Sequence, residues 1–238
     1  MSIETELARV GRYRWQRQQQ EQWDRWSNFI YPVVRLSGVE RRARWFAKHC
    51  QLPPPEFEDY CVARWYNHHT SRLIKRIWTR HPRVRAEANR RYQQRDFRID
   101  RQSFALKTVF PPAALHGVAL HAWLADPLAA LRWYYTRQSS TRFHAAPRLF
   151  LMLVDGDNHP ERRRRKAEFA TLRQAIGCYL DAGTSSYPSI QFTHCERSYR
   201  APAAEIICVL FGEVCRVRWW RWGADGGTPV EHPLVHPA

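Results

Sequence analysis

The chain has 238 residues, of which 44% are hydrophobic and 25% charged, a globular balance that suits one compact domain or one domain with an added arm. Lysine and arginine total 38 against 22 acidic residues, so the formal net charge is +16, and nucleic acid is expected as the partner rather than a membrane surface. No apolar run is long enough to span a membrane.

The six cysteines form no Cys-x-x-Cys pair, so a zinc ribbon is not expected. The first residues contain no apolar leader segment. We therefore expect a reduced, cytoplasmic protein in which the cysteines are mostly buried apolar side chains.

The N-terminal part is basic and rich in tryptophan. Residues 4–30 are predicted to form one helix, and residues 36–49 a second, basic helix. Three consecutive prolines from Pro53 are expected to interrupt regular structure. We interpret residues 1–52 as a helical arm packed on the body, whose aromatic side chains could also contact a partner protein.

The central part alternates helices and strands. Residues 58–80 are predicted to form a helix that ends at His81-Pro82. Residues 96–100 and 104–109 each alternate apolar and polar side chains, and the short segment between them suits a hairpin.

The remaining elements complete the predicted core. Asp126-Pro127 is typical of a helix start, and the apolar run of residues 148–155 predicts a central strand buried on both faces. The further predictions are a helix to about 138, a helix over 161–182 ended by Gly183, and strands over 204–211 and 214–222. This order predicts an α/β fold: a mixed central sheet flanked by helices in a core over 56–222, followed by a flexible tail over 223–238.

The hairpin brings polar side chains to one face. Because side chains alternate along a strand, pairing the apolar faces places Asp96, position 105 and Lys107 on the opposite face. A carboxylate and a lysine that meet there could hold a divalent cation and orient a water against a phosphodiester.

The segment from Asp96 to Lys107 resembles the PD-(D/E)XK nucleases, the restriction-endonuclease-like superfamily. These proteins carry an Asp at a strand start, then a second acid, one spacer and a Lys on the next strand; here Ala105 takes the place of the second acid. The order of three further motifs is similar to an uncharacterised bacterial branch of this superfamily: Trp65-Tyr66-Asn67-His68, Arg137-Gln138-Ser139 and Arg148-Leu149-Phe150.

The resemblance covers about residues 60–182. It implies a DNA-binding hydrolase with an endonuclease fold that uses Mg²⁺ or Mn²⁺. Asp96 would bind the metal, Lys107 would orient the attacking water or steady the phosphate, and Gln138 is a polar candidate near the site.

Two departures from the family pattern bear on catalysis. Ala105 has a methyl group, which cannot bind a metal, and the acid often supplied by the preceding helix would fall near Lys75. Three explanations are open: an acid at position 105 was replaced, the site is naturally degenerate, or acids from elsewhere complete it. The acids considered for the last explanation are Glu58, Asp59 and Glu87.

Two basic segments are expected to grip a nucleic-acid backbone. The first contains Arg83, Arg85, Arg90 and Arg91, and the second contains Arg162, Arg163, Arg164, Arg165 and Lys166. The second run opens a predicted helix, where positive charge is unfavourable unless a phosphate lies near, although a solvated face would also explain it.

Three functional hypotheses follow. The first is a metal-dependent DNA endonuclease fold, inactivated as written. The second is a non-catalytic nucleic-acid-binding subunit of a larger assembly, and the third an RNA-binding factor that stacks bases on aromatic side chains. An ordinary amphipathic hairpin with polar residues facing solvent is the structural alternative for Asp96–Lys107.

Overall fold

A computed structural model describes residues 2–11, 21–88, 94–138, 143–155, 160–183, 186–224 and 226–235. The chain divides into two compact units, Met1–Ile74 and Lys75–Ala238. The division lies inside helix α4 (Pro54–Thr79), later in the chain than the three prolines at which we expected the boundary. Each unit is described separately below.

The first unit is helical. It contains α1 (Ile3–Ala8), α2 (Glu21–Trp26), the short 3₁₀ helix η1 (Ser27–Ile30), α3 (Leu36–His49) and most of α4. Trp23 packs edge-on against Phe57 and Tyr60, with ring centroids 5.2 Å apart in both pairs.

The prediction of a second basic helix over 36–49 is confirmed by α3, but the single helix over 4–30 is wrong. Helix α1 ends at Ala8, and Gly11, a poor helix former, follows closely. The prolines lie at the break between α3 and α4, but only Pro53 stands outside a helix. α4 begins at Pro54, and proline is accepted in a first helical turn because its missing N–H has no partner there.

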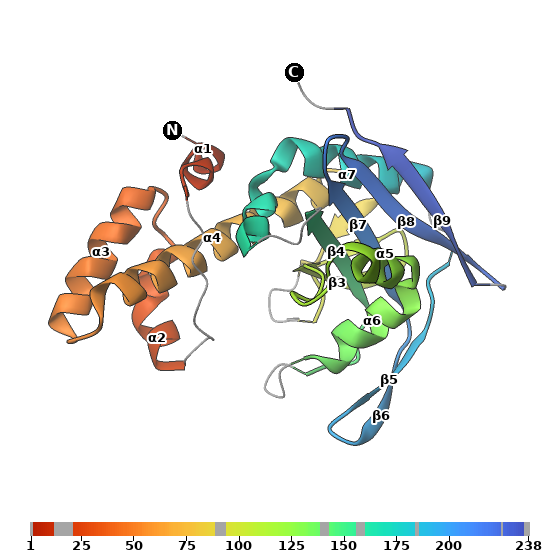
Figure 1. The fold of residues 1–238 in the computed structure, drawn as a ribbon, viewed down its shortest axis with the longest axis horizontal. Coiled ribbons are helices and arrows are strands. Elements are labelled where there is room, and N and C mark those ends of the chain that lie inside the picture. Colours follow the sequence, from red (N-terminus) through yellow and green to blue (C-terminus); the bar gives the residue numbers. More distant parts are fainter. Residues whose placement is uncertain are drawn as a thin grey trace. The chain divides into compact units, whose positions relative to one another are not determined.

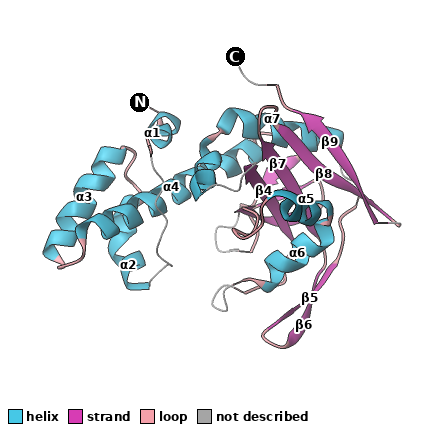
Figure 2. Cartoon of the chain, in the orientation of Figure 1, coloured by secondary structure: helices cyan, strands magenta, loops and turns pink. Residues whose placement is uncertain are grey.

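A seven-stranded mixed sheet forms the centre of the second unit, which confirms the predicted fold class (Figures 1 and 2). The strands pair in the order β1-β2-β3-β4-β7-β8-β9. β4 pairs in parallel with β3 and with β7. All other pairs of this sheet are antiparallel. Their bounds are β1 (Val84–Ala86), β2 (Phe97–Ile99), β3 (Gln102–Val109), β4 (Arg148–Asp155), β7 (Ala204–Phe211), β8 (Arg216–Gly223) and β9 (Gly226–Pro233).

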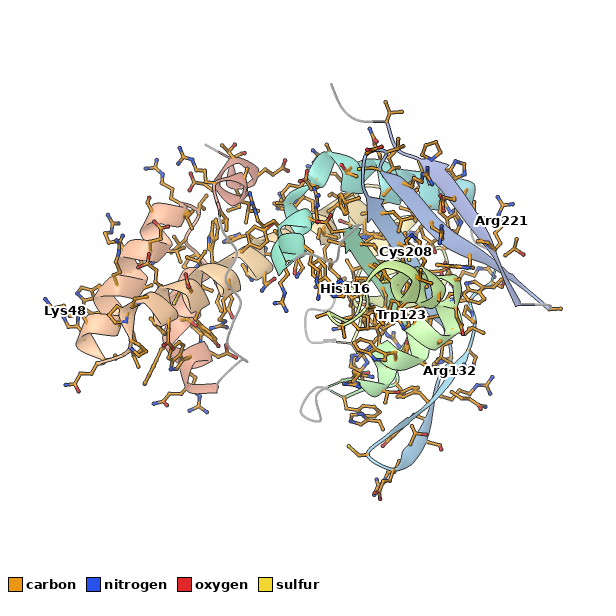
Figure 3. All side chains as sticks on the ribbon, in the orientation of Figure 1. Lys48, His116, Trp123, Arg132, Cys208 and Arg221 are labelled. Atoms are coloured by element: carbon orange, nitrogen blue, oxygen red, sulfur yellow. The ribbon has the colours of Figure 1, made fainter. Side chains whose placement is uncertain are left out.

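Helices cover both faces of this sheet. On one face, α5 (Gly117–Ala125) and α6 (Pro127–Thr136) pack on alternate residues of β4 and β7, with Cys208 of β7 and Trp123 of α5 in the layer between them (Figure 3). On the other face, Tyr179 of α7 (Phe169–Ala182) meets Trp78 and Trp219. A separate hairpin of β5 (Ile190–His194) and β6 (Arg197–Ala201) extends from the α6 side, where Phe192 contacts Tyr135.

Several elements follow the sequence prediction closely. The hairpin of β2 and β3, the buried β4 and the helix begun by Asp126 are all present, and the Asp126 carboxylate accepts the N–H of Ala129 at 2.9 Å. Two predictions are wrong. The basic run forms a 3₁₀ helix, η3 (Pro160–Ala167), so α7 begins only at Phe169, and the tail is not loose throughout, since β9 pairs with β8.

No helix in the described part of the chain is both long and apolar enough to cross a membrane.

Candidate nucleic-acid interface

The register of β2, β3 and β4 fixes which side chains share a face. Phe97 pairs with Phe104, and Trp78 stacks on Phe97 with centroids 5.4 Å apart, so these rings face the α7 side of the sheet. Ala105 pairs with Arg148, and Lys107 pairs with Phe150, which belongs to the α6 side. Alternation therefore brings position 105, Lys107 and Arg148 to one face, the face that the sequence pattern predicts.

Asp96 stands directly before β2 and is bound by two partners. One carboxylate oxygen lies 2.5 Å from the Lys75 ammonium nitrogen, and the other accepts the backbone N–H of Leu106 at 2.8 Å. The carboxylate thus gives β3 one more hydrogen bond just before the first residue of β2, and Lys75 supplies its counter-charge. The helix position at which the family pattern has an acid does reach Asp96, but it carries a cation.

The other acid positions do not complete a metal site. Ala105 is 1% exposed and offers only a methyl group. Glu87 continues the β1–β2 register, and its N–H donates to the Asp96 carbonyl oxygen at 3.1 Å. Glu58 and Asp59 belong to the first unit, where Glu58 pairs with Arg44.

The residues present therefore do not fit a Mg²⁺ ion. Magnesium sites need carboxylate and carbonyl oxygens free to bind it. Here both Asp96 oxygens are engaged, and nowhere in the described part of the chain do three or more His, Cys, Asp or Glu side chains gather as a metal site would require.

Arg148 is the centre of a second group on this face. The residue is 5% exposed, and its guanidinium donates to the Gln138 side-chain oxygen and lies 2.9 Å from Nε2 of His144. It also lies over the ring of Tyr135, 5.4 Å from the centroid. Among the described residues no carboxylate pairs with Arg148, and its buried Nε has no hydrogen-bond partner.

The described groups around Arg148 are neutral or positively charged. Burial, and after it the charges of Arg148 and Lys107, together lower the pKa of His144 to about 4, so this imidazole is neutral at physiological pH. Burial also lowers the pKa of Arg148 itself. Buried Nδ1 of His144 has no partner in the described structure.

Gln138 has a positioning role here. Its oxygen accepts from Arg148 and from the His144 backbone N–H at 3.2 Å, and its nitrogen donates to the Tyr135 carbonyl at 2.9 Å. The described contacts of Gln138 thus tie the end of α6 to Arg148 and include none to Asp96.

The residues of the first basic segment differ in their surroundings. Arg83 forms a two-bond pair with Asp100, at 3.2 and 2.5 Å, and donates to the Leu180 carbonyl, so it holds the fold together. Arg85 is exposed and pairs in register with exposed Arg98. Arg90 and Arg91 lie outside the described residues.

The second basic segment follows the far end of β4. Arg165 pairs with Asp155 at 3.0 Å and lies over the Phe211 ring, while Arg162 and Lys166 lie over the ring of Phe110. Arg163 and Arg164 belong to the same 3₁₀ helix. Seven steps of about 3.3 Å along β4 separate Arg148 from Asp155, or about 23 Å, so the two basic regions do not form one site.

Two members of the Arg148 group were missed from the sequence. In the sequence, Arg148 stands out only as part of the motif Arg148-Leu149-Phe150 that opens an apolar strand, without a role of its own, and His144 is not singled out. A useful signal was present: an arginine at the start of a strand buried on both faces must bury its charge.

No protein-family model, curated protein or solved structure matches the chain. The relation to the PD-(D/E)XK nucleases therefore stays a prediction carried by the sequence motifs.

Proposed function

We propose that this chain is a non-catalytic nucleic-acid-binding protein that grips the phosphate backbone of duplex DNA. The observation that carries the proposal is the ion pair of Lys75 with Asp96: the acid that would hold a catalytic metal is neutralised by a lysine, and Ala105 beside it supplies no second acid. What remains on this face is positive charge.

The distribution of charge supports a polyanionic partner. Arg85 and Arg98 are direct cross-strand neighbours on β1 and β2, an arrangement that is unfavourable unless an anion lies near. Lys107 on β3 and Arg148 on β4 continue the positive side chains on this face of the sheet. With a net charge of +16, the field of the whole chain favours the same partner.

The proposal is tested by fluorescence anisotropy of labelled duplex DNA at several salt concentrations. We expect tight binding whose affinity falls steeply with salt, by about one power of the salt concentration per phosphate contacted, and no cleavage in Mg²⁺ or Mn²⁺. Binding that is unchanged between low and high salt would contradict the polyanion premise. Preference for single-stranded RNA over duplex DNA would favour the RNA-binding alternative, and cleavage by the natural chain that is lost in Lys107→Ala would contradict the non-catalytic role.

A nuclease ancestry is the second candidate, because the helix position of the family pattern, Lys75, reaches Asp96, and β3, which carries positions 105 and 107, binds the Asp96 carboxylate through the Leu106 N–H. The double substitution Ala105→Asp with Lys75→Glu would supply both missing acids. We expect the double variant to bind Mn²⁺ in calorimetry and to nick plasmid DNA, and Lys107→Ala in that background to abolish nicking. A folded double variant that binds no metal would exclude this arrangement as a former metal site.

A cytoplasmic location and a protein partner belong to the same proposal. The six cysteines are free thiols, which suits a reducing compartment such as the cytoplasm. In the first unit Trp45 is 60% exposed on α3, a surface that a partner protein of a larger assembly could cover.

A further inference from the structure

Arg148 is a buried cation that has no acidic partner among the residues that the structure describes. Its side chain enters the sheet at the first residue of β4, where the neighbour on β3 is the methyl group of Ala105. Buried charges in proteins are normally paired or bind a ligand, because the desolvation of an unpaired ion is strongly unfavourable. No described carboxylate pairs with this guanidinium, which points to an anion that comes from outside the chain.

The groups around Arg148 can orient it but cannot neutralise it. Gln138 and His144 both contact the same guanidinium nitrogen, Nη2, and Tyr135 offers a ring face. All three are uncharged at neutral pH. Lys107, whose charge acts on His144, is also positive.

The donors of this cluster match a phosphate group. A guanidinium held in a fixed orientation presents N–H donors in a planar fork, which suits phosphate oxygens. Buried Nε of Arg148 and buried Nδ1 of His144 both lack a hydrogen-bond partner in the described structure. Lys107, partly exposed on the adjacent strand, adds an ammonium group.

We infer that Arg148, His144 and Lys107 form a binding site for one phosphate group of the nucleic-acid backbone, with Gln138 as the positioning residue for Arg148. The inference deepens the proposed function and rests on it for the source of the phosphate. The absent acid at position 105 is part of the site: a carboxylate there would stand beside Arg148 and compete with the ligand.

The first test uses inorganic phosphate with the full chain. We expect phosphate to raise the thermal midpoint above that in chloride at the same ionic strength, and Arg148→Gln to remove this difference. Histidine NMR gives a readout that a purely structural role would not move: phosphate should raise the pKa of His144, since an anion beside it favours the protonated ring. The His144→Gln variant assigns the signal.

The second test uses duplex DNA with two matched variants. Arg148→Gln should weaken binding about 10- to 100-fold, equally for all sequences, and reduce the slope of log affinity against log salt by about 1. Arg221→Gln, the same charge change at an exposed position of β8 (Figure 3), is the control and should have a much smaller effect. If Arg148→Gln fails to fold, Lys107→Gln decides, with an expected loss in the same direction.

The outcomes separate the two proposals. Suppose that the chain binds DNA in a salt-sensitive way, that Arg148→Gln, Lys107→Gln and Arg221→Gln all have the same DNA affinity, and that phosphate has no specific effect. This result overturns the phosphate site and keeps the proposed function. Phosphate stabilisation that depends on Arg148 in a chain that binds no nucleic acid supports the anion site and overturns the proposed function.

Discussion

Glu205 is a fully buried carboxyl group in β7, 0% exposed, on the sheet face opposite the Arg148 cluster. One oxygen accepts the Ile206 N–H at 2.8 Å and the Trp222 indole N–H at 3.4 Å, while the other has no partner among the described groups. Burial raises the pKa of Glu205 to about 8, so the carboxyl group is largely protonated at neutral pH.

This residue predicts a pH dependence of stability. The folded chain holds the proton more tightly than the unfolded chain, so the contribution is complete below the ordinary pKa of 4.5 and is lost as the pH rises to about 8. The expected loss is on the order of 2–4 kcal/mol. Urea unfolding at several pH values should show a flatter profile for Glu205→Gln than for the natural chain.

A suitable control is Glu213→Gln, since Glu213 is exposed in the turn before β8. Its profile should follow that of the natural chain. Identical profiles for Glu205→Gln and the natural chain between pH 5 and pH 8 would show that Glu205 does not carry the proton.

At the residue scale, alternation alone predicted which face carries Asp96 and Lys107, because side chains alternate strictly along a strand. The family resemblance puts Lys75 at the helix position of the metal site, but its ion pair with Asp96 could not be derived from periodicity. The pair depends on where a helix crosses the sheet, and no local pattern encodes that position. The Arg148 cluster was missed for the same reason, since it joins the end of α6 to the start of β4.

At the element scale, elements with strong periodicity or a marked cap were predicted well, and those with unusual turn chemistry were missed. Strand β5 alternates as a strand should, with buried Ile190 and Phe192. Its turn, however, is Cys195-Glu196, both with positive φ, 46° and 63°. Such turns usually contain Asn-Gly, so residues 195–196 carry no hairpin signal.

Substitutions in the β5–β6 turn should therefore increase the stability of the fold. Cys195→Asn together with Glu196→Gly should raise the free energy of unfolding by about 1 kcal/mol, because a left-handed backbone costs an ordinary side chain about 1–2 kcal/mol. Glu213→Gly is the contrast, since Glu213 has no positive φ and glycine there should be neutral or destabilising. Chemical denaturation of the three proteins checks this, and an equal effect at both turns would contradict the strain.

At the scale of the whole molecule, the charge of +16 acts on the free protein as well as on its partner. Like charges repel in the compact state, and salt screens that repulsion. We expect moderate sodium chloride to raise the thermal midpoint of the free chain by about 2–4 °C, while the same salt weakens DNA binding. A midpoint that falls with added salt would mean that attractive ion pairs, such as Arg83 with Asp100, dominate instead.

The central strand β4 is synthesised on the ribosome well before one of its two partners in the sheet, β7. β4, with the apolar run Leu149–Val154, is paired on one side by β3 but on the other only by β7, which begins at Ala204. Until β7 has emerged, one edge of β4 and much of its apolar surface stay uncovered, and parallel pairing between such distant segments closes slowly. The nascent chain therefore passes through a stage at which it is prone to self-association and a natural client for a chaperone.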